Sequence, residues 1–457
     1  MTSGTIAEQI GAWCNRTELG DISEPMLRRT KLHIMDQIGA QVSCRTMPTV
    51  ELAFDYARRH ARDGKALLVG TDAGVDAEYA GFANGTAGSA FEIDDYGGNG
   101  AYSHPGCTVL PAVLAMAQEH GASGEDLLRG TALGFETIIR LARATMPSMF
   151  LGRGFHHTSA LGAIGAAVGC GALLRLPPEV TANAISIAAS QSAGTTEYAQ
   201  SGGEVKRCHA GLAVAAAIRA VRLAQAGLTA PPTILEGSRG FFQAYCDTYD
   251  AAQMTNELGT RWFFLEHAAI KPYAACGLFH HHFAAYDDLL ARHGFAPSDI
   301  ESIELGCEPL MMIHNGAHGP APKDIVGAQF SSQFSMGMHI VLGRNDVGAY
   351  LDQQAEGFAN PEVIGIARRI TTHERPEFGE FPPRGSVAIT LRDGTTVEAT
   401  GFALGSPENP LSEDDIRGKY LQLVSRDYGE DLAERSMDMM LSLELLPDAG
   451  ELLRQFA

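Results

Sequence analysis

The sequence predicts a fold that is mostly α with an α+β module. In this fold, both chain ends form a large all-helical domain and a smaller α+β domain is inserted between them. Helical periodicity of apolar residues fills about the first 260 of the 457 residues and returns near Asp414. Short alternating runs typical of strands begin after about residue 267. We therefore expect the helical domain at residues 1–267 and 405–457 and the α+β domain at residues 268–404.

Long helices are expected throughout the first half of the chain. In the first of them, apolar residues recur at helical spacings from Met26 to Ile38. Gly121 and Ser123 are typical of a helix break and an N-cap between two further helices. The Pro177–Pro178 pair opens another helix, since proline is favoured in a first turn. The predicted spans are 24–43, 107–119, 125–144, 177–192 and 205–226.

Two helical segments, 159–174 and 210–218, are apolar all round and rich in glycine and alanine. A membrane span is one interpretation, but it needs about 20 apolar residues. The first run is closely bounded by Arg153 and Arg175. We favour buried central helices whose small side chains let neighbouring backbones approach, and we expect no membrane partner.

The strand signals lie between the two helical regions. Residues 300–307 alternate between apolar and polar side chains, as a half-buried strand does. Residues 386–402 form two alternating runs around Asp393-Gly394, a strong signal for a hairpin turn. Residues 370–373 are a candidate for a further strand.

Composition limits the possible partners and compartments. The formal net charge is −20, with 34 Lys and Arg against 54 Asp and Glu, so nucleic acid is an unfavourable partner. A local basic pocket still allows an anionic small substrate. The eight cysteines are scattered without a CxxC pair, and the N-terminus lacks a basic region followed by an apolar stretch. These features predict a cytoplasmic protein.

The first chemically interesting cluster combines acidic residues, glycines and a histidine. Residues 91–96 (FEIDDY) precede Gly97-Gly98-Asn99-Gly100, and His104 follows within Ser-His-Pro-Gly. So many glycines favour a specific backbone path or mobility. His104 leads into a helix, where an anion site is natural. The alternative is an ordinary polar loop.

Two further clusters precede the small-residue helices. His156 lies in Arg-Gly-Phe-His-His-Thr, where it either serves catalysis or satisfies a buried polar group. Lys206 follows a glycine loop at residues 201–203. A lysine near a packed segment is costly unless it is solvated or paired, and a bound carboxylate would pair it. The alternative is a surface lysine at a helix start.

The fourth cluster, residues 270–282 (IKPYAACGLFHHH), holds Lys271 and three consecutive histidines. Successive helical side chains point about 100° apart, so these histidines cannot chelate one metal together. His104, His156 and His280 could still converge, but we favour no metal site.

Several reaction types lack their motifs. The chain has no GxSxG elbow and no GxxxxGK[ST] loop, and its cysteine spacing does not suit an iron–sulfur cluster. The remaining His, Lys, Asp and Tyr side chains suit proton removal beside a carboxylate without a built-in cofactor. The difficulty of that reaction is stabilising the developing carbanion or enediolate.

The four clusters, in this order, resemble the MmgE/PrpD family, which includes 2-methylcitrate dehydratases, cis-aconitate decarboxylases and iminodisuccinate epimerases. The resemblance extends over nearly the whole chain. It includes residues 229–241 (TAPPTILEGSRGF), 327–331 (GAQFS) and 405–411 (GSPENPL). Together these motifs are specific for the family but not for one reaction.

The resemblance implies a cofactor-free homodimer that acts on a small anionic carboxylate in a cleft between its two domains. By position, the implied catalytic residues are Asp94 or Asp95, His104, His156, Lys206 and Lys271. The expected substrate-binding residues are Tyr96, Lys206, Lys271, Tyr273, Cys276 and His280.

The sequence departs from the family pattern at two points. Tyr96 stands where a threonine is expected, and Cys276 stands where several members carry a histidine that His280 would replace. These differences argue against cis-aconitate decarboxylation. We therefore expect a lyase of the dehydratase type, with an epimerase as the main alternative. A decarboxylase and a non-catalytic carboxylate-binding scaffold are further alternatives.

Overall fold

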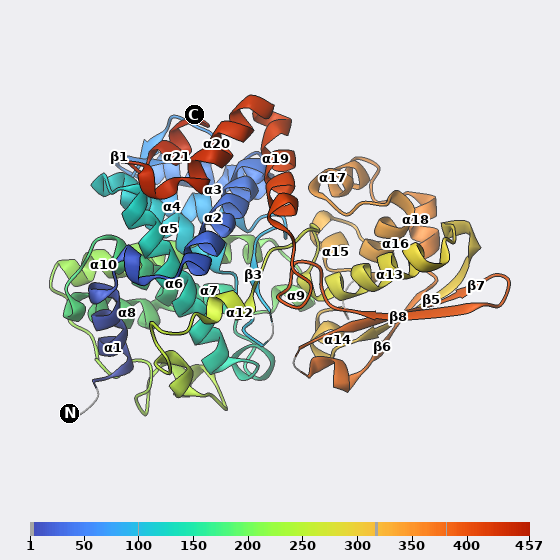
Figure 1. Cartoon of the computed structure of the whole chain (residues 1–457), viewed down its shortest axis with the longest axis horizontal. Helices are drawn as coiled ribbons and strands as arrows, with labels where there is room; N and C mark the ends of the chain where they lie inside the picture. Colours follow the sequence, from blue (N-terminus) through green and yellow to red (C-terminus); the bar gives the residue numbers. More distant parts are fainter. Residues whose placement is uncertain (1–3, 99, 316–318, 381) are drawn as a thin grey trace.

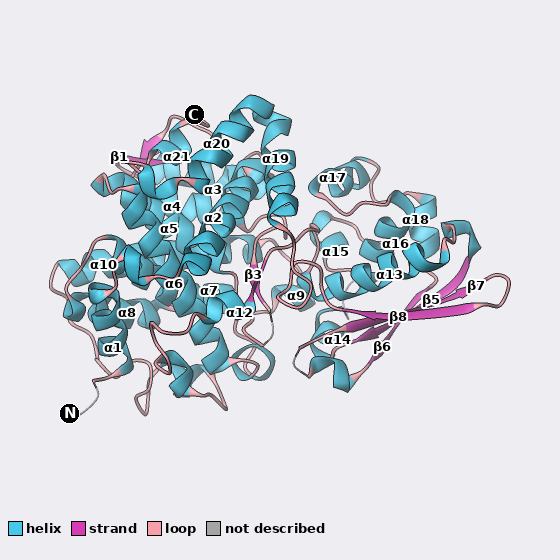
Figure 2. Cartoon of the chain, in the orientation of Figure 1, coloured by secondary structure: helices cyan, strands magenta, loops and turns pink. Residues whose placement is uncertain are grey.

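The computed structural model describes residues 4–98, 100–315, 319–380 and 382–457, which form two bodies side by side (Figure 1). The larger body is helical, and the smaller one combines helices with most of the strand residues (Figure 2). Helices from both ends of the chain, blue and red in Figure 1, share the larger body. The predicted fold class is therefore confirmed.

The five predicted helices are confirmed to within a few residues. The Ser123 hydroxyl accepts the Asp126 N–H at 3.1 Å, as predicted for an N-cap. The larger body contains α1 (Ile6–Arg16), α2 (Glu24–Cys44), α3 (Pro48–His60), α4 (Ala77–Gly88), α5 (Pro105–His120), α6 (Gly124–Thr145), α7 (His157–Leu173), α8 (Pro178–Gln191), α9 (Tyr198–Ser201), α10 (Val205–Gln225), α11 (Phe241–Tyr245), α12 (Phe263–His267), α19 (Glu413–Tyr428), α20 (Glu430–Leu441) and α21 (Glu451–Arg454).

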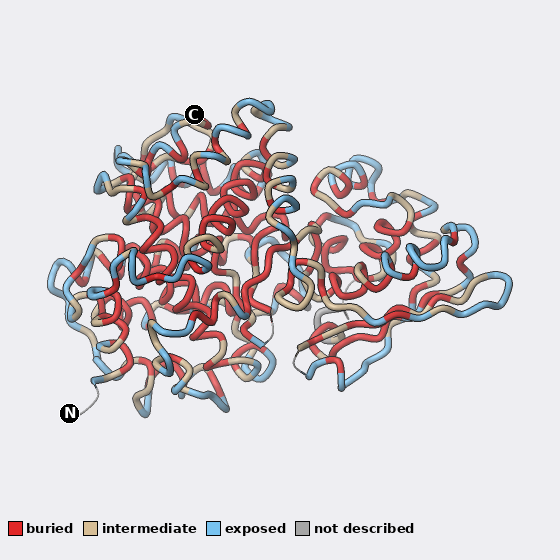
Figure 3. Tube along the Cα trace, viewed as in Figure 1, coloured by how far each residue is buried: buried red, intermediate tan, exposed pale blue. Residues whose placement is uncertain are grey.

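The small-residue helices α7 and α10 lie in the core of the larger body, which Figure 3 shows as a continuous buried region. Their glycines allow very close backbone approach. A Cβ atom added at Gly211 would lie 2.2 Å from the carbonyl oxygen of Phe82, and one at Gly165 would lie 2.1 Å from the Ile138 side chain. Within the described ranges, no helix has the length and apolar character needed to cross a bilayer.

The C-terminal helices complete the larger body. Helices α19 and α20 pack against α2 near the N-terminus. Lys419 of α19 donates from Nζ to Asp36 Oδ1 at 2.5 Å and to the Ile93 carbonyl oxygen at 2.7 Å. On this packing we propose residues 1–267 with 405–457 as one domain and 268–404 as the other.

The sheet of the smaller body has the strand order β6-β5-β7-β8. Strands β5 (Ile300–Cys307), β6 (Ile370–Glu374), β7 (Gly385–Leu391) and β8 (Thr396–Gly401) confirm the predicted strands and hairpin. Ile389 pairs with Val397 across the hairpin, and Gly394 in its turn has φ +88°. The helices here are α13 (His280–His293), α14 (Pro309–Asn315), α15 (Ile325–Gln329), α16 (Ser332–Leu342), α17 (Val347–Ala355) and α18 (Pro361–Ala367).

Two small sheets were not expected from the sequence. Strand β1 (Asp63–Leu67) pairs with β2 (Gly74–Val75), and β3 (Tyr96–Gly97) pairs with β4 (Ala268–Ala269). Three of these four strands have only two residues, which is too short to carry an alternating pattern. The β3–β4 pair matters for function, because it joins the first sequence cluster to the residues directly before the fourth.

Candidate active site

A cavity of about 840 Å³ lies between the two bodies, and all four sequence clusters contribute to its lining. The larger body supplies residues from the first three clusters together with Ser406 and Glu408, and the smaller body supplies Lys271 and residues that follow it up to Pro383. The polar and ionisable residues around the cavity are Glu92, Tyr96, Tyr102, Ser103, His104, His156, His157, Tyr198, Lys206, Lys271, Cys276, His281, Glu308, Ser406 and Glu408.

Glycines bring the chain segments around the cavity close together. A Cβ atom at Gly97 would lie 2.1 Å from the Ala101 carbonyl oxygen, so the glycine loop needs glycine there. Gly405 has φ +93°, and a Cβ atom there would lie 2.0 Å from the Ile270 carbonyl oxygen. The closing motif can therefore pass directly beside Lys271. Asn99 of the glycine loop lies outside the described residues.

The Gly-Ala-Gln-Phe-Ser motif connects the two bodies at the cavity. Gln329 donates from Nε2 to the Phe91 carbonyl oxygen at 2.7 Å and to the Ala274 carbonyl oxygen at 2.9 Å. The next residue, Phe330, places its ring 5.0 Å from the Lys206 ammonium nitrogen. This motif thus holds the acidic cluster and the segment after Lys271 in a fixed relation.

The buried Lys271 and the partly buried Lys206 share one carboxylate, that of Glu92. Lys206 forms an ion pair with Glu92 Oε1, and Lys271 lies 3.3 Å from Glu92 Oε2. Lys271 also lies 3.4 Å from Asp94 Oδ1. Glu92 has φ +57°, a conformation that is uncommon outside glycine. Glu92 was not among the predicted site residues, although its place in the acidic cluster was a usable signal.

Burial and neighbouring charges shift the pKa values of Lys206 and Asp94 at this end of the cavity. Burial and the nearby Lys271 hold the pKa of Lys206 well below its usual range. Burial works against ionisation of Asp94, but His104 and Lys271 outweigh it and hold the Asp94 pKa well below its usual range. Burial therefore opposes the charged form of Lys206, which the contact with Glu92 favours, and both lysines line the cavity.

His104 is held in one tautomer by the acidic cluster. Its Nδ1 lies 2.9 Å from Asp94 Oδ2 and 2.7 Å from the Asp95 carbonyl oxygen, and both are acceptors. Nδ1 therefore carries a proton, and Nε2 of the neutral ring is an acceptor. A carboxylate behind an imidazole orients the ring and stabilises its protonated form. This arrangement suits a general base.

The side chain of Asp95 makes different contacts from that of Asp94. Its Oδ2 lies 2.7 Å from Nδ1 of the buried His33, and its Oδ1 accepts the Gly106 N–H at 2.8 Å. Neither aspartate lines the cavity itself, but Asp94 contacts His104 and Lys271, which do. The Asp95 side chain supports the start of α5, and Asp94 is the carboxylate that contacts two cavity-lining groups.

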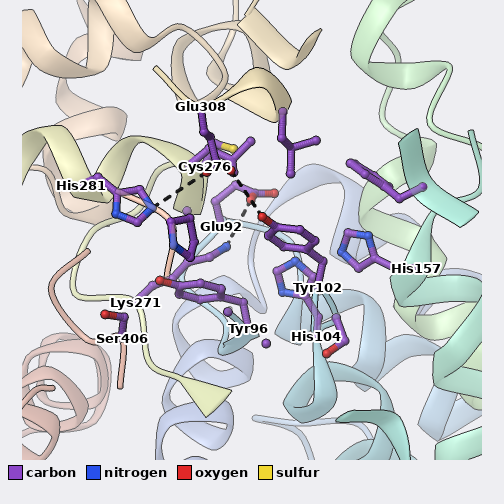
Figure 4. A pocket seen from close by; sticks show the side chains of 18 of the residues that line it. Glu92, Tyr96, Tyr102, His104, His157, Lys271, Cys276, His281, Glu308 and Ser406 are labelled. Atoms are coloured by element: carbon purple, nitrogen blue, oxygen red, sulfur yellow. Dashed lines mark hydrogen bonds and ion pairs between the residues drawn. The ribbon is translucent and has the colours of Figure 1, made fainter. Parts of the chain in front are cut away.

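Both residues of the His156–His157 pair line the cavity, although the sequence analysis selected only the first. His156 Nδ1 lies 2.7 Å from His209 Nδ1, and His156 Nε2 lies 3.2 Å from the Thr158 hydroxyl. Both ring nitrogens of His156 are therefore engaged. His157 stacks on His104 with 5.5 Å between ring centroids, which makes it a second imidazole at the site (Figure 4).

The fourth cluster enters the cavity through different residues from those expected. Cys276 lines the cavity as predicted, but His281 takes the place that was assigned to His280. His280 is buried, with Nε2 3.2 Å from the Ala275 carbonyl oxygen. Tyr273 lies outside the cavity and donates to Asp287 at 3.3 Å. Tyr96 and both lysines line the cavity as predicted.

The smaller body adds Glu308, which the sequence analysis missed. Figure 4 shows Glu308 and His281 together on one side of the cavity, with Tyr102 between Glu308 and the two stacked histidines. Glu308 directly follows β5, so an acidic residue after a buried strand was the available signal. In the described part of the chain, no three His, Cys, Asp or Glu side chains are grouped to hold a metal ion.

Comparisons with known proteins agree with the arrangement of the site. The N-terminal domain model of the MmgE/PrpD family matches residues 8–254, and its C-terminal domain model matches residues 273–445. A cis-aconitate decarboxylase from Aspergillus terreus is 28% identical across 98% of this chain and 95% of that protein. Cis-aconitate decarboxylases from mouse and human are each 24% identical across 99% of this chain and 94% of those proteins.

Proposed function

Because the chain belongs to the MmgE/PrpD family, we propose that it is a cofactor-independent dehydratase of a small di- or tricarboxylic acid, similar to 2-methylcitrate dehydratase. Family membership and the similar decarboxylases support the broader class, a lyase-type enzyme acting on carboxylic acids. The observation that carries the proposal is the meeting of Lys206 and Lys271 with the Asp94–His104 pair at one cavity.

In this proposal, a substrate carboxylate binds beside the two lysines. Each ammonium has three donors, so Lys206 keeps donors for a ligand while it is paired with Glu92. His104 Nε2 removes the α-proton, and Asp94 stabilises the resulting imidazolium. The C–H electron pair moves onto the carboxylate as an enediolate, which the lysines stabilise. Loss of the β-hydroxyl group as water then forms the double bond.

A second candidate reaction is decarboxylation, favoured by the names of the similar proteins. The same lysines would stabilise the electron pair left when carbon dioxide departs. The cavity supports dehydration more directly, because dehydration needs both a base and an acid near adjacent carbons. His104, His157, His281 and Glu308 provide several groups for these two roles.

Proton NMR in deuterated buffer tests the proposal directly. Citrate, 2-methylcitrate, cis-aconitate and malate would be incubated with the purified protein, with and without a chelator. We expect deuterium at the α-carbon and new alkene signals from a hydroxy acid, unchanged by the chelator. Carbon dioxide release from cis-aconitate would support the second candidate, and inverted stereochemistry with retained mass would support epimerisation. Activity that requires an added metal would overturn the proposal.

We also propose that the enzyme acts as a homodimer on an anionic substrate. This follows from family membership rather than from any contact within one chain. Light scattering of the purified protein at several concentrations measures the mass in solution. A mass of one 48.6 kDa chain at all concentrations would contradict the dimer.

A further inference from the structure

Glu308 is a buried carboxyl group on the face of the cavity that the smaller body provides. It is 3% exposed and lies beside Cys276 and His281 in the cavity lining. Within the described ranges, no lysine or arginine nitrogen lies within ion-pair distance of Glu308. A histidine is nearby, since His281 Nε2 lies 3.9 Å from Glu308 Oε1. The carboxylates of Glu92 and Asp94, by contrast, contact lysines.

The hydrogen bonds of Glu308 leave one oxygen unsatisfied. The Tyr102 hydroxyl donates to Oε2 at 3.3 Å. Oε1 is buried and has no hydrogen-bond partner among the described residues. An ionised carboxylate in this position would lack compensation for its lost hydration. A neutral carboxyl group carries its proton on the oxygen that Tyr102 does not serve.

His281 cannot remove this proton in its observed arrangement. Its Nδ1 accepts the Ala403 N–H at 2.9 Å, so the ring proton lies on Nε2, the nitrogen nearest Glu308. Burial and the adjacent His282 lower the pKa of His281 to about 3, so the ring stays neutral at physiological pH. Among the described residues, Glu308 also influences the pKa values of Tyr96, Tyr102, Cys276 and Cys307, which are all neutral in their ordinary forms.

We propose that Glu308 is the proton donor of the reaction, and that the Tyr102 hydroxyl, which donates to Oε2, positions its neutral carboxyl group toward the substrate. Figure 4 shows Glu308 and Lys271 reaching the same cavity from different directions, Glu308 from above and Lys271 from below. A substrate held by the lysines would thus present its departing hydroxyl group to Glu308. This inference rests on the proposed dehydration. Burial supports it by raising the pKa of Glu308 to about 7, against the lowering effect of the Tyr102 hydrogen bond.

The step balances without a co-reactant. The C–O bond breaks, the oxygen keeps the electron pair and takes the Glu308 proton, and water leaves. The electron pair of the broken C–H bond becomes the double bond, while His104 holds the α-proton. Proton exchange with solvent then returns His104 to its neutral form and Glu308 to its protonated form.

The first experiment compares elimination with α-proton exchange in Glu308→Gln. We expect elimination to fall by at least about 10²-fold, the usual contribution of a general acid, with KM nearly unchanged. Deuterium exchange at the α-carbon should persist, because the base side of the site is intact. Glu304→Gln on the exposed face of the same strand is the matched control and should change neither rate.

The pH profile separates a proton donor from a merely structural residue. Wild-type elimination should decline as the pH rises through about 7, where Glu308 loses its proton. Tyr102→Phe should move this decline to higher pH, because the Tyr102 hydrogen bond lowers the Glu308 pKa. Elimination by Glu308→Gln within twofold of the wild-type rate, or an unchanged profile in Tyr102→Phe, would overturn the inference.

Infrared spectroscopy tests Glu308 even if none of the acids turns over. The wild-type minus Glu308→Gln difference spectrum should contain a protonated carboxyl band that titrates near pH 7 and shifts when citrate is added. The inference would be overturned if the band were absent, or if its frequency did not change when citrate or any of the other acids was added. A citrate-sensitive band without turnover would instead count against the proposed function alone.

Discussion

The two faces of the cavity differ in the charged groups that they carry. The face from the larger body, together with Lys271 of the smaller body, concentrates ions that neutralise one another, namely Lys206, Lys271, Glu92 and Asp94. The face from the smaller body offers Cys276, His281 and Glu308 without a lysine or arginine partner in the described residues. One face is therefore suited to hold an anion, and the other to exchange protons as neutral groups.

Removing Lys271 should have the largest effect on stability and activity, because this lysine contacts both Glu92 and Asp94. Lys271→Met leaves the buried Glu92 and Asp94 short of a cation, and breaking a buried pair costs about 3–5 kcal/mol. We also expect kcat/KM to fall at least about 10²–10³-fold. Chemical denaturation and steady-state rates measure the two effects.

Lys206→Met sharpens this test, since Lys206 pairs with Glu92 while Lys271 continues to do so. It should lose comparable activity with a smaller loss of stability. Lys65→Met, an exposed lysine of β1, should alter the free energy of unfolding by no more than about 0.5 kcal/mol. If Lys271→Met keeps most of its activity, the charged face does not bind the substrate.

The adjacent carboxylates Asp94 and Asp95 should respond differently to the same substitution. Asp94→Asn removes the carboxylate behind His104, and we expect kcat to fall by about 10²–10⁴-fold. Asp95→Asn weakens the contacts to His33 and to the Gly106 N–H, which should cost about 1–3 kcal/mol of stability. The Asp95 carbonyl oxygen still accepts from His104, so kcat should fall much less. Equal losses of kcat would show that both carboxylates act on the base.

This pair also illustrates what the sequence can predict. Long periodic segments and the Asp-Gly hairpin are local patterns, so the helices and strands that carry the site were predictable. Asp94 and Asp95 are neighbours, and only the backbone path of the loop decides which side chain contacts the cavity-lining groups. The choice between His280 and His281 depends on where α13 begins, because neighbouring helical side chains point about 100° apart.

Glu92 and Glu308 were harder to predict for a different reason. Glu92 reaches both lysines from a backbone conformation that favours glycine, which a sequence pattern does not reveal. Glu308 belongs to none of the four clusters, and it meets them only because the smaller body packs across the cavity. Tertiary packing, rather than local propensity, placed both carboxyl groups.

The pH dependence of stability should distinguish the two faces with a moderate effect. The raised pKa of Glu308 contributes stability at pH values below its unfolded-state pKa, and that stability is lost as the pH rises to about 7. Relative to Glu308→Gln, the wild type should therefore lose about 3 kcal/mol between about pH 4 and pH 7. The lowered pKa of Asp94 acts in the opposite sense, and its stabilisation disappears only as the pH falls below about 4.

Urea unfolding of wild type, Glu308→Gln and Asp94→Asn across this range measures both contributions. A constant difference between wild type and Glu308→Gln over the same range would mean that Glu308 is ionised in the folded protein, which would remove the contrast between the two faces.

The smallest effect is expected at Tyr273, which the sequence suggested as a substrate-binding residue. Its hydroxyl donates to Asp287 at 3.3 Å, and its ring packs on His280, Phe283 and His339 outside the cavity. Tyr273→Phe keeps the ring and removes a partly exposed hydrogen bond, so stability should fall by about 1 kcal/mol or less. KM and kcat should stay at the wild-type values, whereas Tyr96→Phe alters a hydroxyl-bearing side chain of the cavity itself. A KM that rises in Tyr273→Phe but not in Tyr96→Phe would mean that the substrate reaches beyond the cavity into the smaller body. Both faces, not only the charged one, would then hold its carboxylates.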